Sequence, residues 1–278
     1  MNQAAVPHEL KTVGVVGAGR MGTPIVGHLV RRGFTTRVFD VNAARAGAVR
    51  GLGAKWAASP ESLSAECDAI LVCVGFDREV QELLAEGGPL RRARPGAIVA
   101  ILSTIHPKTV QKLAKECESA ELHVVDSTVC RGGEAADHGT LLSFVGGSAE
   151  VVARLTPVLR AYSADVVHTG GVGTAQVAKA VNNLILWACL VADHEGLALA
   201  RHYGADIEAL RKALLMSSCA NGPLEKWGSQ TMAWAEDDMA IVAEMAAEAG
   251  IALPQADVNR EICGALKPRR YKLELYGR

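Results

Sequence analysis

The chain has 278 residues, of which 49% are hydrophobic, and its 29 basic and 30 acidic residues give a formal net charge of -1. This length and apolar content suffice for one large or two ordinary folded domains, and they exclude a disordered chain. The balanced charge gives no reason to expect a nucleic-acid surface or an anionic membrane as a partner.

The first part of the chain alternates apolar runs with helical stretches, as expected for a sheet covered by helices on both faces. We expect strands at residues 12–16, 35–39, 69–74, 97–102, 122–126, 141–145 and 164–168. From Thr174 on, a helix of about 28 residues is followed by helical segments near 206–215, 237–249 and 254–265. The sequence thus predicts a Rossmann-type doubly wound parallel sheet domain over residues 1–169. An all-helical substrate and dimerisation domain is predicted over residues 170–278.

The long apolar helix is interrupted by polar and charged side chains such as Lys179, Asp193 and Glu195, so we interpret it as a buried helix and not as a membrane span. A helix that is apolar on most sides needs more partner surface than the remaining helical segments supply. We therefore expect a homodimer or a higher homo-oligomer formed through the helical domain. The last residues, 267–278, resemble a surface extension.

The seven cysteines contain no C-x-x-C pair, and neither they nor the eight histidines follow the spacing of metal ligands. A dispersed, odd set of cysteines is typical of reduced thiols in the cytosol. Residues 1–10 lack the basic and apolar pattern of a secretory signal. We therefore expect a cytoplasmic protein that uses no metal.

A glycine-rich loop, G-A-G-R-M-G, separates the first predicted strand from a helix that begins near Met21. Gly17 permits a tight turn, Gly19 lets a pyrophosphate approach the backbone, and Gly22 allows close packing of helix on strand. The helix N-terminus attracts phosphates through its N–H groups and its dipole. We expect this loop, with Arg20 and Met21, to bind a dinucleotide; the alternative is a purely structural turn.

Asp40 ends the second predicted strand, 18 residues after Gly22, close to the spacing typical of a ribose-binding acid. A carboxylate there can accept both ribose hydroxyls of adenosine and would repel a 2′-phosphate. The alternative is a solvated surface aspartate. We predict NAD(H) as the cofactor, in preference to NADP(H).

Lys179 and Asn183 are spaced to project from one face of the long helix, one turn apart. A lysine on an otherwise apolar helix is costly unless it faces a cleft, and its ammonium group can donate a proton to an alkoxide formed by hydride transfer. Asn183 can bond the same oxygen or hold the lysine. The spacing alone fits equally well a lysine that extends to solvent beside a packing asparagine.

Four ordered motifs resemble those of the β-hydroxyacid dehydrogenase family, the 3-hydroxyisobutyrate dehydrogenase-like group. They are the glycine loop with Met21 and Pro24, Ser103-Thr104-x-x-Pro107, the block Asp126-Ser127-Thr128-Val129-Cys130-Arg131-Gly132-Gly133, and Gly170-x-x-Gly173-x5-Lys179-x-x-Asn182-Asn183. The resemblance spans residues 13–183 and weakens beyond residue 215.

The resemblance implies oxidation of a small 3-hydroxy acid to an aldehyde or keto acid, or the reverse reduction. Lys179 would be the general acid/base and Asn183 its partner. Contacts to the nicotinamide half of the cofactor would come from Thr104 and from Val74-Gly75. The substrate carboxylate would be held by the turn at Cys130, Arg131, Gly132 and Gly133.

Two departures from the family pattern concern the substrate. Cys130 and Arg131 stand where the family usually has Ser and Gly, and Asp237 stands where it commonly has a lysine. Thiols donate hydrogen bonds more weakly than hydroxyls, whereas a guanidinium suits carboxylates, sulfonates or phosphates. Either Arg131 binds an acidic group of an altered, small anionic substrate, or it points to solvent from a loop.

Two other functions are compatible with the sequence. Imine reductases share the two-domain layout, although a lysine at position 179 argues against that activity. A non-catalytic, NAD(H)-binding dimer would fit if the changes at Arg131 and Asp237 had abolished turnover, although the intact pair of Lys179 and Asn183 argues against it.

Overall fold

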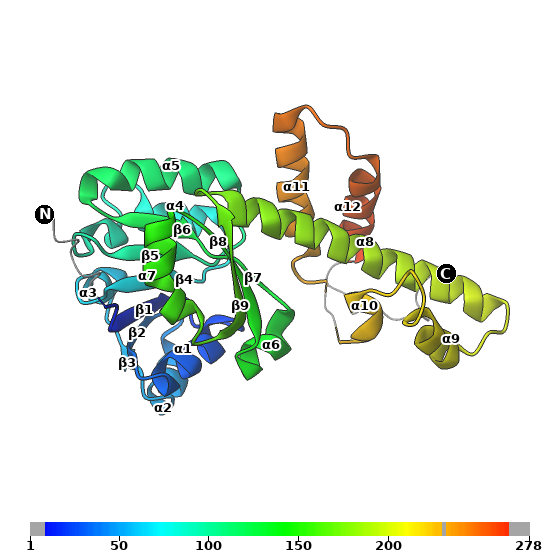
Figure 1. The fold of residues 1–278 in the computed structure, drawn as a ribbon, viewed down its shortest axis with the longest axis horizontal. Helices are drawn as coiled ribbons and strands as arrows, with labels where there is room; N and C mark the ends of the chain where they lie inside the picture. Colours follow the sequence, from blue (N-terminus) through cyan, green and yellow to red (C-terminus); the bar gives the residue numbers. More distant parts are fainter. Residues whose placement is uncertain (1–8, 230–231, 267–278) are drawn as a thin grey trace, which may run out of the picture. The chain divides into compact units, whose positions relative to one another are not determined.

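The protein is described here by a computed structural model covering residues 9–229 and 232–266 (Figure 1). The predicted surface extension at 267–278 and most of the N-terminal segment lie outside the described residues. The chain forms two compact units, residues 1–179 and 180–278. This division falls within helix α8 (Thr174–His202), whose first turn is bonded to the sheet.

The described part of the first unit contains one nine-stranded sheet. In chain order its strands are β1 (Thr12–Val16), β2 (Thr35–Phe39), β3 (Lys55–Trp56), β4 (Ala69–Val72), β5 (Ile98–Ile101), β6 (His123–Asp126), β7 (Val129–Cys130), β8 (Leu141–Gly146) and β9 (Ser163–Gly170). Its helices before α8 are α1 (Gly22–Arg31), α2 (Ala46–Gly51), α3 (Pro60–Ser64), α4 (Asp77–Leu84), α5 (Pro107–Cys117), α6 (Gly132–His138) and α7 (Ala149–Leu159).

The sheet has the order β3-β2-β1-β4-β5-β6-β8-β7, with β9 beside β8. In this order, all neighbouring strands from β3 to β6 (β3-β2-β1-β4-β5-β6) are parallel. The order reverses between β1 and β4, which confirms the predicted doubly wound fold. The sheet also contains an antiparallel part that the sequence patterns did not indicate, because β8 runs antiparallel to both β6 and β7. The two-residue strands β3 and β7 are too short to give a sequence pattern.

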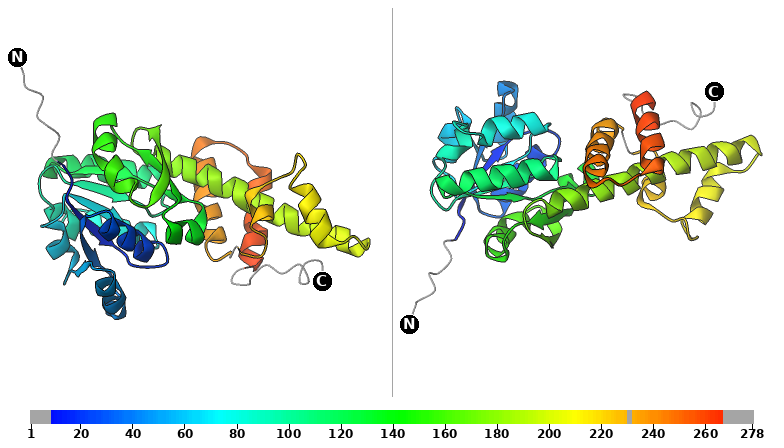
Figure 2. Two further views of the ribbon diagram at one scale, coloured as in Figure 1. Left: turned by 60° about the horizontal axis from the view of Figure 1, so that its bottom comes forward. Right: turned by 90° about the horizontal axis from the view of Figure 1, so that it is seen from above.

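Helices cover both faces of the sheet, as the views in Figure 2 show. Alternate residues of each central strand point to opposite faces, so Leu71 joins a core with α1, α6 and α7, while Ile70 joins a core with α3, α4 and α5. Strands that are buried on both faces need continuous apolar runs, and β4 and β5 are buried at every residue.

The N-terminus of α8 is bonded to the end of β6. The buried carboxylate of Asp126 accepts hydrogen bonds from the N–H groups of Gly173 (2.7 Å) and Gln176 (2.9 Å). Gln176, which is 1% exposed, donates to the carbonyl of Ser103 and accepts from the N–H of Ile105. These bonds satisfy N–H groups that the first helical turn leaves without partners.

The described residues of the second unit form helices joined by turns and loops, with no strand. After α8 it contains α9 (Ile207–Leu214), α10 (Gly222–Glu225), α11 (Ala235–Ala249) and α12 (Pro254–Leu266). Its core joins α8 to α11 and α12 through side chains such as Trp187, Met239 and Cys263, and the Trp187 indole donates to Asp238 (2.9 Å). Four-residue α10 was not predicted, because it is one turn held by its Asn221 cap.

Helix α8 is the one helix in the described part of the chain that is long and apolar enough to span a membrane. Core helices of soluble proteins have the same length and composition. Here Ala180, Trp187 and Leu190 are buried in the core of the second unit, and Asn183 and His194 are 3% exposed. These contacts favour the interpretation of α8 as a packing helix.

We predict that Asp126→Ala lowers the free energy of unfolding by about 2–4 kcal/mol, because it leaves two buried N–H groups without an acceptor. Asp165→Ala is the matched control, since its carboxylate is 55% exposed and a surface ion pair contributes at most about 1 kcal/mol. Urea denaturation measures both, and equal losses would contradict the role given to Asp126.

Candidate functional site

The carboxyl ends of four neighbouring strands form one edge of the sheet. The strand register aligns Val16 with Val72, Val72 with Ile101, and Ile101 with Asp126. The predicted site elements before α8 follow these strands or the adjacent β2. Ligands of open α/β sheets bind at this edge, beside the point where the strand order reverses.

The glycine loop is shaped by close backbone contacts. Gly17 has a φ of 98°, and a Cβ atom there would lie 2.2 Å from the carbonyl oxygen of Cys73. A Cβ atom on Gly22 would lie 2.0 Å from the carbonyl oxygen of Gly17. Both glycines are therefore required by the fold itself, which brings α1 close against β1 and β4.

Gly19 differs from these two glycines because its surroundings are open. A Cβ atom on Gly19 would meet nothing within 4 Å except Nη1 of Arg45 at 3.5 Å. Helix α1 begins beside it with no side-chain cap at Met21, and in its first turn the N–H of Thr23 donates to the Gly19 carbonyl (3.1 Å). The open space at Gly19 and the adjoining N-terminus of α1 therefore fit the pyrophosphate of a dinucleotide, which must approach the backbone closely.

Asp40 is 7% exposed and already has three hydrogen-bond donors. Its Oδ2 accepts from the N–H of Ala18 (2.7 Å) and from Nη1 of Arg45 (2.7 Å), and its Oδ1 accepts from the N–H of Asn42 (2.8 Å). The carboxylate thus links the end of β2 to the glycine loop, where an adenosine ribose would lie. Arg45 is a neighbour that the sequence analysis missed, because it lies in the short helix after β2 and belongs to no motif.

The ends of β4 and β5 are joined by the Ser103 hydroxyl, which accepts from the N–H of Val74 (3.0 Å) and donates to the Val74 carbonyl (2.9 Å). The N–H of Gly75 donates to the Glu79 carboxylate (2.8 Å), which caps α4. Half-buried Thr104 follows Ser103 at the same edge. Val74, Gly75 and Thr104 are therefore neighbours, and their contact with nicotinamide stays a prediction.

Lys179 is half-buried on α8, and its ammonium group lies at the loop after β6. Nζ donates to the carbonyl of Val129 (2.8 Å) and lies 3.9 Å from Sγ of Cys130. An ammonium group has three donors, so these two contacts leave one N–H for a substrate oxygen. The structure thus brings Lys179 together with Cys130, one of the predicted substrate residues.

Asn183 lies one turn beyond Lys179 on the same helix, in the second unit, and its side chain is 3% exposed. Its Oδ1 accepts from the side-chain amide of Asn182 (3.0 Å). Asp237, the other departure from the family pattern, lies in the first turn of α11 and is half-buried. The catalytic role of Asn183 stays a prediction.

Arg131 has a φ of 84°, in the left-handed region that favours glycine, and it precedes α6. Its guanidinium pairs with Asp165 (2.7 Å) and donates to the carbonyl of Thr140 (3.1 Å). In this conformation the side chain ties the loop to β8 and β9, so substrate binding by Arg131 would have to compete with these bonds. Gly132 and Gly133 form the first turn of α6.

Asp126 and Gln176 organise the site and were not among the predicted site residues. Burial raises the pKa of the Asp126 carboxyl, and the N–H bonds from Gly173 and Gln176 oppose that shift. Both side chains form hydrogen bonds with backbone groups, and such bonds produce no sequence motif. The only signal in the sequence is a polar residue at the end of a strand or the start of a helix. In the described ranges, no group of three or more His, Cys, Asp or Glu side chains could hold a metal ion.

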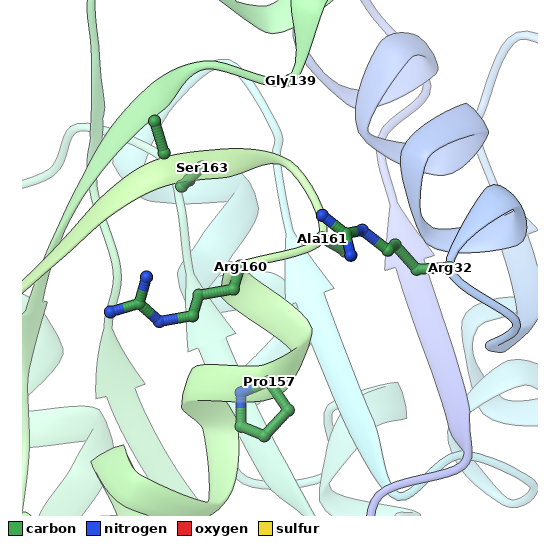
Figure 3. A pocket seen from close by; sticks show the side chains of 7 residues that line it. Arg32, Gly139, Pro157, Arg160, Ala161 and Ser163 are labelled. Atoms are coloured by element: carbon green, nitrogen blue, oxygen red, sulfur yellow. The ribbon is translucent and has the colours of Figure 1, made fainter.

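A pocket of about 350 Å³ lies elsewhere on the first unit (Figure 3). It is lined by Arg32, Gly139, Pro157, Arg160, Ala161, Ser163 and Ala164. Arg32 follows the C-terminus of α1, whereas the glycine loop precedes its N-terminus. Its lining contains none of the site residues predicted from the sequence.

Two protein-family models match successive parts of the chain. Residues 12–171 match a model described as the NAD binding domain of 6-phosphogluconate dehydrogenase. Residues 173–272 match a model described as NAD-binding of NADP-dependent 3-hydroxyisobutyrate dehydrogenase.

Individual proteins are similar over most of the chain. A probable mitochondrial 3-hydroxyisobutyrate dehydrogenase of Dictyostelium discoideum is 33% identical over 201 residues, which are 72% of this chain and 63% of that protein. An NAD-dependent L-serine dehydrogenase of Pseudomonas aeruginosa is 30% identical, over 78% of this chain and 73% of that protein. The fold matches a solved Mycobacterium tuberculosis 3-hydroxyisobutyrate dehydrogenase with L-serine, with a TM-score of 0.86, 23% identity and coverage of 96% and 97%.

The two kinds of glycine in the loop give a matched prediction. Gly19→Ala is expected to fold normally but to weaken dinucleotide binding by at least about tenfold, because its new methyl group enters the space for the pyrophosphate. Gly17→Ala is expected to destabilise the fold, because its methyl group meets backbone. Thermal unfolding and NADH titration measure the two effects, and normal NADH affinity in Gly19→Ala would contradict the assignment.

Proposed function

Because this chain belongs to the 3-hydroxyisobutyrate dehydrogenase-like family of β-hydroxyacid dehydrogenases, which are NAD(P)-dependent oxidoreductases, we propose that it interconverts a small 3-hydroxy acid and the matching aldehyde or keto acid. The proposal rests on one observation above others. The Lys179 ammonium group is fixed by the Val129 carbonyl at the carboxyl edge of the sheet, where the glycine loop lies.

The bound dinucleotide would supply or accept the hydride. The glycine loop and the N-terminus of α1 would hold its pyrophosphate. Lys179 would hold the reacting proton: in reduction its remaining N–H donates to the substrate carbonyl oxygen, and in oxidation the amine accepts the hydroxyl proton. The Val129 carbonyl would keep Nζ in place while the proton moves.

We propose that the substrate is a small anion. Lys179 provides a cation, and the N–H groups around Gly132 and Gly133 are near the loop that holds it. The names of the relatives above suggest 3-hydroxyisobutyrate and L-serine as the first compounds to test. The direct experiment is an absorbance assay with NAD(H) and NADP(H) over a panel of 3-hydroxy acids and their aldehydes, with a cyclic imine included.

The panel separates the proposed function from its competitors. Turnover of a hydroxy acid supports the proposal, whereas preferential reduction of the imine would support an imine reductase. NADH binding without turnover of any compound would support a non-catalytic dimer. The lysine at position 179 favours a substrate whose oxygen must be protonated or deprotonated.

We also propose a cytoplasmic homo-oligomer formed through α8. Val177, Val181 and Ile185 recur every four residues on this helix and are 41%, 49% and 57% exposed. Such a stripe lies on one face of a helix, and contiguous exposed apolar surface marks protein interfaces. Light scattering on the purified protein determines the number of copies, and a monomer at micromolar concentration would contradict this proposal.

Lys179→Ala is expected to lower kcat by roughly 10²- to 10⁴-fold and to leave NADH affinity nearly unchanged, because the lysine acts on the substrate proton. Lys179→Arg is the control for charge, since a guanidinium keeps the cation but does not deprotonate. Single-turnover hydride transfer measures the effect. Normal turnover in Lys179→Ala would remove the central residue of the proposed mechanism.

We propose a preference for NAD(H), because the negative Asp40 lies where a ribose would bind. Asp40→Ala is expected to weaken NAD(H) and to improve NADP(H) relative to it, since Arg45 loses its partner and can pair with a 2′-phosphate. The double variant Asp40→Ala/Arg45→Ala should lose the gain in NADP(H). Specificity constants for both cofactors measure this, and equal use of NADP(H) by the unmutated protein would contradict the preference.

A further inference from the structure

Helix α6 is bonded to the glycine loop by a bidentate ion pair. Arg20, inside the loop, donates from Nη1 to Oδ1 of Asp137 (2.8 Å) and from Nη2 to Oδ2 (2.7 Å). Hydrogen bonding from Arg20 holds the pKa of Asp137 below its usual range, so the carboxylate stays charged. Paired parallel bonds of this kind fix the direction of both groups.

The backbone of α6 is adapted to this pair. A Cβ atom on Gly133 would lie 2.5 Å from Nη2 and 2.7 Å from Cζ of Arg20, so the guanidinium lies directly against the Gly133 backbone. Any larger residue at position 133 would displace the Arg20 side chain. Arg20 thus contacts α6 at two points, the Gly133 backbone and the Asp137 carboxylate.

A second polar contact joins α1 to the C-terminal end of α6. Nε2 of His28 lies 3.0 Å from the Ala136 carbonyl oxygen and 3.1 Å from that of Asp137. Nδ1 of His28 lies 2.8 Å from Nη2 of Arg31, which can only donate. Nδ1 therefore accepts, and Nε2–H donates to the last carbonyls of α6. His28 and Arg20 together attach α6 to both ends of the same helix.

Helix α6 follows directly on the loop that holds the candidate catalytic lysine. Val129 and Cys130 precede Arg131, after which α6 begins at Gly132. The Val129 carbonyl accepts from Nζ of Lys179. A continuous set of contacts in the first unit therefore runs from the glycine loop through α6 to the Lys179 ammonium group.

We propose that Arg20 and Asp137 are positioning residues, which keep α6 and the Val129 carbonyl in register with the cofactor bound on the glycine loop. The inference rests on the proposed function, because it assumes that this loop binds NAD(H). Both side chains are at least half exposed, at 60% and 50%, so the pair contributes little to overall stability. The pair sets the direction of α6, and through the loop that contains Val129 it affects the position of the Lys179 ammonium group.

The alternative role for Arg20 is a direct bond to the cofactor phosphate. The two roles differ in what Asp137 should do. If Arg20 positions α6, removing either partner has the same effect, and removing both adds nothing. If Arg20 binds phosphate, Arg20→Gln weakens NADH binding and Asp137→Asn does not.

Hydrogen exchange with NADH as the probe tests the coupling without a known substrate. In the unmutated protein, saturating NADH is expected to slow exchange at residues 17–27 and also at residues 132–139, the latter by roughly fivefold or more. In Asp137→Asn the slowing should persist at 17–27 and disappear at 132–139. Glu82→Gln, which breaks the exposed pair between Arg78 and Glu82 on α4, is the matched control and should behave like the unmutated protein.

Kinetics with the best hydroxy acid from the panel give the second readout. Asp137→Asn and Arg20→Gln should each lower kcat/KM for the hydroxy acid by about 5- to 50-fold, with NADH affinity within about twofold, and the double variant should be no worse. Gly133→Ala is expected to act like Asp137→Asn, because its methyl group displaces Arg20 without changing any charge.

The outcomes separate the inference from the proposed function. Absence of NADH protection at 17–27 in the unmutated protein would overturn both. Protection at 17–27 with none at 132–139, or additive losses in the double variant, would overturn the coupling alone. A loss of NADH affinity confined to Arg20→Gln would assign that residue to the phosphate instead.

Discussion

The candidate site depends on one buried carboxylate. Asp126 ends β6, and through two N–H bonds it fixes where α8 begins. Gly146 lies so close that a Cβ atom there would be 2.5 Å from Oδ1 of Asp126, so the neighbouring strand leaves no room for another arrangement. With the start of α8 fixed, the position of Lys179 on its second turn follows from helix geometry. The Val129 carbonyl then fixes the lysine side chain.

Charge at the cofactor end of the sheet edge is balanced in pairs. Asp40 faces Arg45, and Arg20 faces Asp137, so neither the acid near the ribose position nor the cation in the glycine loop is uncompensated. The proposed preference for NAD(H) therefore depends on Asp40 and Arg45 together, and the spacing that identifies Asp40 gives no information on Arg45.

The sequence was sufficient for the parts of this protein that local patterns determine. Continuous apolar runs predicted the long strands, and the order of strand, glycine loop and helix predicted the edge where the site lies. The ion pairs that side chains form with distant parts of the chain could not be predicted in the same way. Arg45 pairs with Asp40, and Arg131 pairs with Asp165, because the fold brings their loops and strands together. The spacing of these residues in the sequence does not indicate either pair.

The antiparallel strands are a further case. The sequence of β8 has the same apolar character as that of β5, and only the path of the chain through β7 and α6 decides that β8 runs the other way. Periodicity reports which faces of a strand are buried and is silent on its direction. The turn from β7 into α6 needs a left-handed backbone conformation at Arg131. Because this conformation favours glycine, an arginine at that position does not indicate it.

Helix α6 shows why the departure at Arg131 is tolerated. A helix of seven residues between two left-handed residues, Arg131 and Gly139, has too few internal bonds to hold its own direction. External polar contacts hold it: Arg131 to Asp165 before its first turn, Asp137 to Arg20 in its last, and His28 to its final carbonyls. An arginine at a glycine position strains the backbone, and its ion pair with β9 offsets part of that cost. The same bonds connect α6 to the glycine loop and to the loop that holds Lys179.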